Sequence, residues 1–125
     1  MNERALLWAR SGLVWLLVTM AAGLHIGLAG EFGAAAHHAH AGLLGGLWAM
    51  GFAFLFDPRG SALTAAAKVQ WALYNLGVAT MAVSMFLVIR HSEAWGSVIG
   101  AGALLVIATT AWIAMDAWPR SDRPA

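Results

Sequence analysis

Cysteine is absent from the sequence, so the chain can form neither a disulfide bond nor a thiolate metal site. Charged residues are scarce as well, because aspartate, glutamate, lysine and arginine together make up only 10% of the chain. Ligand chemistry must therefore come from histidine, methionine, tyrosine or the few carboxylates. The basic residues are spread along the chain and form no continuous patch, which argues against nucleic acid as a partner.

Sequence patterns typical of an active site are missing too. The chain has no nucleophile–base pair, phosphate-binding loop or carboxylate dyad. Its carboxylates fall at or near the edges of the apolar segments, at Glu3, Glu31, Asp57, Glu93, Asp116 and Asp122. An enzymatic function is therefore poorly supported, and binding, redox transfer or sensing remain.

Apolar residues occur in long runs. The chain is 61% hydrophobic with a mean hydropathy of +0.72, far from the balance of a soluble domain. Four stretches are long enough to cross a hydrocarbon core of about 30 Å, and they cover residues 11–30, 39–56, 69–89 and 94–115. With only short connectors between them, we expect an all-α membrane protein, with residues 1–125 forming one transmembrane domain, an antiparallel bundle of four helices.

The ends of these helices carry several local signals. The first ten residues are a short charged lead, and the apolar run after them is longer than a signal-peptide core, so we expect it to be retained as a span. Trp8 is suited to the headgroup level of the membrane. Asp57 and Pro58 predict the end of the second helix, and Ser61 can cap the third.

Basic residues are distributed unequally between the two predicted faces. One face has Arg90 alone, whereas the other has Arg4, Arg10, Arg59, Lys68, Arg120 and Arg123. The positive-inside tendency then places both termini in the cytoplasm. All five histidines fall on the outer half of the membrane in this orientation.

Four of the five histidines lie between residues 25 and 40. An ionisable side chain at membrane depth indicates a functional site, although His37 and His91 are at helix edges where water or headgroups can solvate them. Neutral imidazole is a common metal ligand and an axial ligand of haem iron. We therefore predict a cofactor or metal site formed by His25, His38 and His40. His38 and His40 differ by about 200° around a helix, so one faces the bundle and the other faces sideways.

Two further patterns concern how the helices pack. Glycines spaced four apart predict close helix contacts, at Gly23 and Gly27, Gly42 and Gly46, and Gly96 and Gly100. Met81 and Met85 share a face of the third helix with Tyr74, a pattern more typical of core packing than of an axial ligand. Trp15, Trp48 and Trp112 are either bundle filling or rings that pack against a flat cofactor.

Three short motifs carry a family resemblance, and they read GLHIG at residues 23–27, HAHAGLLG at 38–45 and WALYNLG at 71–77. The chain resembles small four-helix bacterial membrane proteins related to subunit I of the haem-copper oxidase and nitric oxide reductase superfamily. The resemblance implies that His38 or His40 is an axial ligand of haem b near the outer face. Ala41 and Gly42 stand where these relatives have leucine and asparagine, and Tyr74 stands where they tend to have histidine. The later helices, which carry the binuclear centre of the full oxidase subunit, have no counterpart.

Together these patterns predict a multi-pass protein of the bacterial inner (cytoplasmic) membrane that binds haem b and acts in electron transfer or in redox or gas sensing. Two alternatives remain open: a copper or zinc site made by the same histidines, and a cofactor-free assembly subunit of a respiratory complex. Besides lipid and a respiratory-chain partner, we expect a homo-oligomer in which Gly42 and Gly46 allow close approach of the second helix to a neighbouring copy.

Overall fold

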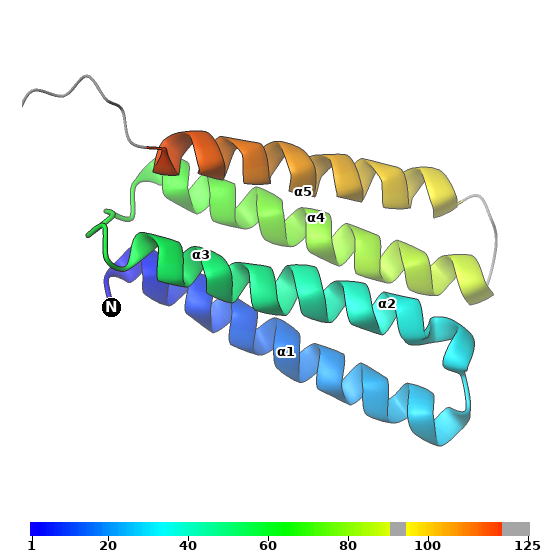
Figure 1. Cartoon of the computed structure of the whole chain (residues 1–125). Coiled ribbons are helices and arrows are strands. Elements are labelled where there is room, and N and C mark those ends of the chain that lie inside the picture. The colour runs from blue at the N-terminus through cyan, green and yellow to red at the C-terminus, as the bar shows by residue number, and fades with distance from the viewer. Residues whose placement is uncertain (91–94, 119–125) are drawn as a thin grey trace, which may run out of the picture.

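The computed structural model describes residues 1–90 and 95–118, and within these ranges every regular element is a helix. Four helical segments are long and apolar enough to cross a membrane, which confirms the expected number of helices able to span it. The first, third and fourth are α1 (Glu3–Ala29), α4 (Ala65–Arg90) and α5 (Gly96–Ala117) (Figure 1). The second is preceded by the short 3-10 helix η1 (Phe32–Ala34). It is continuous but changes helix type along its length, from α2 (Ala35–His40) through the π-helix η2 (Ala41–Trp48) to α3 (Ala49–Phe56).

The first helix begins well before the predicted residue 11. The side chain of Asn2 accepts a hydrogen bond from the backbone N–H of Ala5 at 2.9 Å and so caps the helix from Glu3 onward. The charged lead is therefore helical rather than a separate segment. At the other end Gly30 adopts φ 69°, a left-handed conformation that glycine reaches without steric cost, and the helix stops there.

The start of α4 also differs from the prediction. Thr64, not Ser61, accepts a hydrogen bond at this end, from the backbone N–H of Ala67 at 3.1 Å. The end of α3 at Phe56, directly before Asp57 and Pro58, agrees with the predicted stop. His91, which was predicted to lie at a helix edge, is outside the described residues, as are Arg120 and Arg123 of the charge count.

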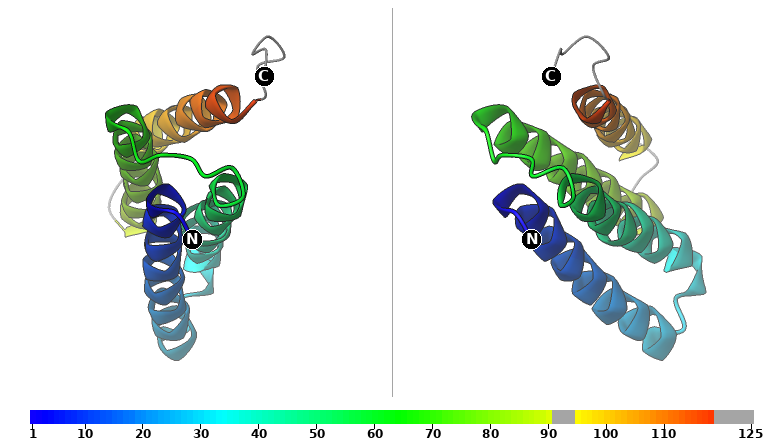
Figure 2. Two further views of the ribbon diagram at one scale, coloured as in Figure 1. Left: turned by 90° about the vertical axis from the view of Figure 1, so that its left-hand side faces the viewer. Right: turned by 60° about the vertical axis from the view of Figure 1, so that its left-hand side comes forward.

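Small residues bring α1 against the second helix. A Cβ atom added at Gly12 would meet Met50, one at Gly42 would meet Thr19, and one at Gly23 would meet His38. The partners of α1 thus follow one another in reverse sequence order, and Figure 2 shows the two helices side by side.

Only some of the glycines predicted to mediate close helix contacts do so. Gly23, Gly42 and Gly46 make close contacts, whereas added Cβ atoms at Gly27, Gly96 and Gly100 would meet nothing within 4 Å. Gly42 and Gly46 are covered by Thr19 and Leu16 of the same chain, so these two glycines are not free to receive a neighbouring copy.

A close backbone approach also joins α4 to α5. An added Cβ atom at Gly77 would lie 3.0 Å from the backbone oxygen of Gly102, and one at Gly102 would lie 3.0 Å from that of Gly77. Because both close contacts involve backbone atoms, no side-chain rotation relieves them.

We expect Gly102→Ala to destabilise the protein by roughly 1–3 kcal/mol, since overpacking at a backbone contact forces the helices apart. Gly100→Ala, two residues away on the same helix, is the matched control because its Cβ would enter open space. Unfolding in mixed micelles followed by tryptophan fluorescence measures both. Equal stability of the two variants would contradict the close crossing.

Large aromatic side chains fill the space between two pairs of helices, α1 with the second helix and α4 with α5. The ring centroid of Trp8 lies 4.9 Å from that of Phe52 and 5.3 Å from that of Tyr74, in edge-to-face geometry. Trp8 is fully buried, so its indole packs inside the protein and does not reach the lipid headgroups for which it was predicted to be suited. Trp8 lies near the start of α1, which is why the sequence predicted a place at the membrane edge. In the folded chain its indole points inward and packs against residues of two other helices.

Candidate functional site

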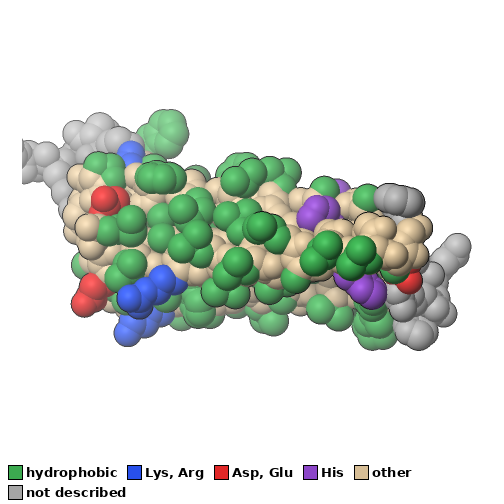
Figure 3. All heavy atoms as spheres, turned by 90° about the horizontal axis from the view of Figure 1, so that it is seen from below, with side chains coloured by type: hydrophobic (Ala, Val, Ile, Leu, Met, Phe, Trp, Pro, Cys, Tyr) green, Lys and Arg blue, Asp and Glu red, His purple; other side chains and the backbone are tan. Residues whose placement is uncertain are grey.

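The described histidines gather toward one end of the structure. Figure 3 shows histidine side chains toward one end of the visible face and lysine and arginine side chains toward the other. We call the end with the histidine side chains the histidine end. The other, which we call the amino-terminal end, contains Asn2, whose backbone N–H donates to Asp57 at 2.9 Å.

His38 is the histidine most firmly held within the protein. Its Nδ1 lies 2.8 Å from the backbone oxygen of Thr19 on α1. A carbonyl oxygen can only accept a hydrogen bond, so Nδ1 carries the proton and Nε2 keeps the lone pair. The ring rests on Gly23, where an added Cβ would lie 2.6 Å from Cε1. Thr19 and Gly23 therefore fix both the tautomer and the position of this imidazole.

His40 has the same tautomer but a different environment. Its Nδ1 lies 2.7 Å from the backbone oxygen of Ala36, one turn earlier on α2, and its side chain is exposed. His38 thus faces α1 while His40 points away from the protein, as their angular separation predicts. Both imidazoles keep Nε2 as the atom with a lone pair.

His25 does not meet His38 in this structure. It is exposed on α1 and lies two residues beyond Gly23, about 200° around the helix from the face that touches His38. Among residues 1–90 and 95–118, no group of three or more histidines and carboxylates is close enough to hold a metal ion. The predicted joint site of His25, His38 and His40 stays a prediction.

His37 is placed differently from expectation. Both of its ring nitrogens are buried and have no hydrogen-bond partner among the described residues. The side chain as a whole is half-buried, so its nitrogens are more enclosed than the prediction of a solvated helix edge implies. The helical segment begins earlier than predicted, at η1, so His37 is no longer at its edge.

The π-helical segment η2 lies between the histidines and the rest of the second helix. Tyr74 on α4 donates a hydrogen bond from its hydroxyl to the backbone oxygen of Leu44 at 2.8 Å. Wide π-helical turns are rare and are found often at functional sites. Gly42, Gly45 and Gly46 pack this segment on α1, and their clustering is the one sequence signal that could have indicated an irregular helix.

A second polar cluster, at the amino-terminal end, was missed by the sequence reasoning. The Nη2 atom of Arg4 donates to Gln70 Oε1 at 2.7 Å and to Asp116 Oδ2 at 2.8 Å. Its guanidinium carbon lies 3.6 Å from the centre of the Phe56 ring. Arg4 was predicted to be a basic residue of the membrane surface, but its side chain is 7% exposed and it pairs inside the protein.

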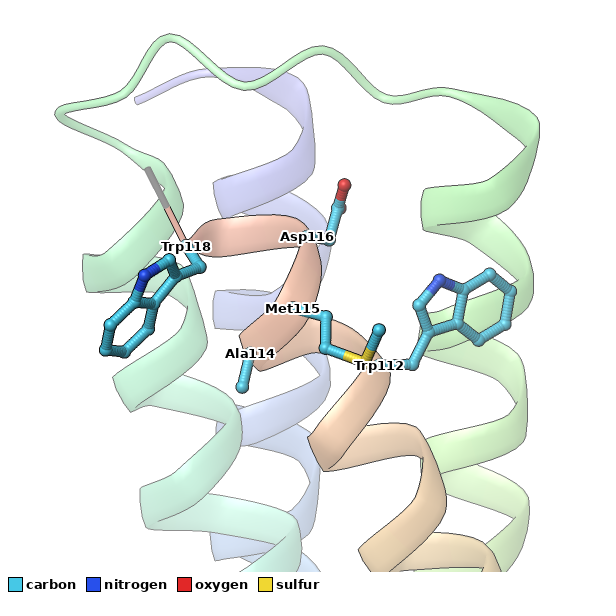
Figure 4. A pocket seen from close by; sticks show the side chains of 5 residues that line it. All are labelled: Trp112, Ala114, Met115, Asp116 and Trp118. Atoms are coloured by element: carbon cyan, nitrogen blue, oxygen red, sulfur yellow. The ribbon is translucent and has the colours of Figure 1, made fainter. Parts of the chain in front are cut away.

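Hollows on the surface lie away from the histidines. One at the end of α5, of about 530 Å³, is lined by Trp112, Ala114, Met115, Asp116 and Trp118 (Figure 4). Another, of about 460 Å³, runs between α1 and α4 and is apolar. Trp15 lines this second hollow and donates from Nε1 to Asn75 Oδ1 at 2.8 Å, which ties its ring to α4.

No family model, curated protein or solved structure matches the chain. The resemblance to relatives of the oxidase subunit therefore stays an expectation from three short motifs. The side-chain geometry is the basis for a functional proposal.

Proposed function

We propose that the chain is a multi-pass protein of a bacterial inner membrane that binds haem b through Nε2 of His38 and acts in electron transfer or redox sensing. In this proposal the four helices form an antiparallel bundle with both termini in the cytoplasm. The excess of Arg and Lys at the amino-terminal end supports that orientation. The histidine end then lies in the outer half of the membrane.

The observation that carries the proposal is the way His38 is held. Histidines that bind metals usually donate their other ring N–H to a carbonyl or carboxylate, which fixes the tautomer and orients the ring. The hydrogen bond from Nδ1 to Thr19 has this form. An imidazole preset in this way presents Nε2 to a ligand without a change of tautomer.

The described residues offer one suitable axial ligand for a haem group but do not identify a second. His38 has the tautomer of an axial ligand, and Gly23 makes room for its ring. His25 faces elsewhere, so the proposal rests on His38 alone as ligand. A bound haem b would supply an iron that gains and loses one electron. The protein's own part is to hold the imidazole, keep its proton on Nδ1 and surround it with apolar helices.

An absorption spectrum tests this proposal. The purified, haem-replete protein is expected to show a Soret band, and His38→Ala is expected to abolish it because the oriented ligand is lost. His25→Ala is the control and should keep the band. A missing band in the wild type, or an unchanged band in His38→Ala, would refute haem ligation by His38.

A copper or zinc ion is a second candidate, and His40 favours it. Its Nε2 is exposed on the protein surface with Nδ1 already bonded to Ala36. An imidazole facing lipid is costly, so a metal ion or a neighbouring copy in a homo-oligomer would cover it. Elemental analysis of the purified protein distinguishes the two candidates, because stoichiometric copper or zinc without a Soret band supports the metal site.

A further inference from the structure

The amino-terminal half of the interior contains two side-chain contacts that run parallel between α1 and α4. In the first, Arg4 bonds Gln70 at 2.7 Å. The second contact lies one turn further along both helices, where the Trp8 ring packs on that of Tyr74 with ring centroids 5.3 Å apart. Residues four apart lie on one helix face, so the two contacts are neighbours. We call the region between them the donor cluster, formed by Arg4, Trp8 and Gln70.

The donor cluster contains N–H groups and lacks acceptors for them. Arg4 Nε, Trp8 Nε1 and Gln70 Nε2 are all buried without a hydrogen-bond partner among the described residues. The amide of Gln70 cannot be reversed, since its oxygen already accepts from Arg4. Arg4, Trp8 and Gln70 are each at most 6% exposed, so bulk solvent does not reach them. Buried donors without acceptors are strongly unfavourable, and three on two facing helices indicate a bound acceptor.

The charge of the region decides what kind of acceptor fits. Arg4 is already neutralised by Asp116, 2.8 Å away. A bound anion would leave an uncompensated negative charge in an apolar interior, which is far more costly than burying a neutral group. A water molecule has two lone pairs for these donors, and its own protons can go to backbone or carboxylate oxygens. Asp116, which accepts a hydrogen bond from Arg4, also lines the hollow at the end of α5.

We propose that the donor cluster is a binding site for ordered water in the amino-terminal half of the bundle. The water accepts hydrogen bonds from Trp8 Nε1 and Gln70 Nε2 and joins α1 to α4. This site is separate from the histidines and does not depend on whether His38 binds a cofactor.

Nuclear magnetic resonance of the full chain in nanodiscs, with ¹⁵N-labelled indole groups, tests the proposal. The Trp8 indole proton, assigned by its loss in Trp8→Phe, is expected to show a cross-peak to water. Trp15 is the matched control, because its indole N–H is bonded to Asn75 and should show none. Gln70→Leu removes one donor and is expected to lose the Trp8 cross-peak while the Trp15 resonance stays in place.

Two results would overturn the proposal. One is a Trp8 indole proton with no water cross-peak in the wild type, like that of Trp15. The other is a Trp8 resonance that shifts saturably when bromide is titrated at constant ionic strength, because that would identify the acceptor as an anion.

Discussion

Replacing Asp116 with alanine is expected to destabilise the protein by about 1–3 kcal/mol, the cost of leaving a buried polar group without its partner. The two partners are not equivalent, because the Arg4 side chain is 7% exposed and that of Asp116 is 45% exposed. Loss of Asp116 leaves a guanidinium inside the protein without a counter-charge. Loss of Arg4 leaves a carboxylate that water can still solvate. Asp116→Ala should therefore be the more damaging change.

A double-mutant cycle makes this asymmetry measurable. Unfolding of Arg4→Leu, Asp116→Ala and the double variant is followed by tryptophan fluorescence in mixed micelles. The double variant should be close to Arg4→Leu alone, since no charge is then left unpaired. Glu3→Ala, at an exposed acidic residue beside Arg4, serves as control and should be near neutral. A larger loss for Arg4→Leu than for Asp116→Ala would contradict a buried, paired guanidinium.

Replacing Gly23 with valine is expected to weaken cofactor binding by roughly 10–100-fold, the effect typical of changes beside a metal ligand. Even the Cβ atom would lie 2.6 Å from Cε1 of His38, so the imidazole must leave its position and its hydrogen bond to Thr19. Titration of haem into the apoprotein, followed by the Soret band, measures the affinity.

Gly27→Val is the matched variant. It makes the same substitution one turn further along α1, where an added Cβ would meet nothing within 4 Å. Any general effect of valine in this helix appears in both variants, whereas displacement of His38 appears only at Gly23. Equal affinities for the two variants would show that the position of His38 does not control binding. The ¹⁵N shifts of the imidazole report separately whether its tautomer has changed.

Hydropathy was sufficient to find the four long helices because their apolar runs are local features of the sequence. The environment of Arg4, in contrast, depends on residues that are distant in sequence. Its partner Asp116 is 112 residues away, and no window around Arg4 contains that information. The same reason explains Trp8, whose neighbours Phe52 and Tyr74 come from two other helices.

The histidine end was predicted in part. The spacing of His38 and His40 gave their divergence correctly, because both lie on the regular helix α2. The wide helix from Ala41 to Trp48 could not be derived from the same reasoning, since helical spacing assumes a uniform number of residues per turn. The hydrogen bond from the Tyr74 hydroxyl to the Leu44 carbonyl was likewise outside what periodicity can show.

The contact between Arg4 and Asp116 also has a consequence for biosynthesis. Arg4 lies in the first turn of α1 and Asp116 in the last turn of α5, so the ribosome makes one partner almost at the start of translation and the other almost at the end. A nascent chain emerges at about 5–20 residues per second, which leaves the guanidinium without its carboxylate for seconds. During that interval Arg4 has to stay near water or headgroups. The inward position of α1 can thus become permanent only after α5 has been synthesised.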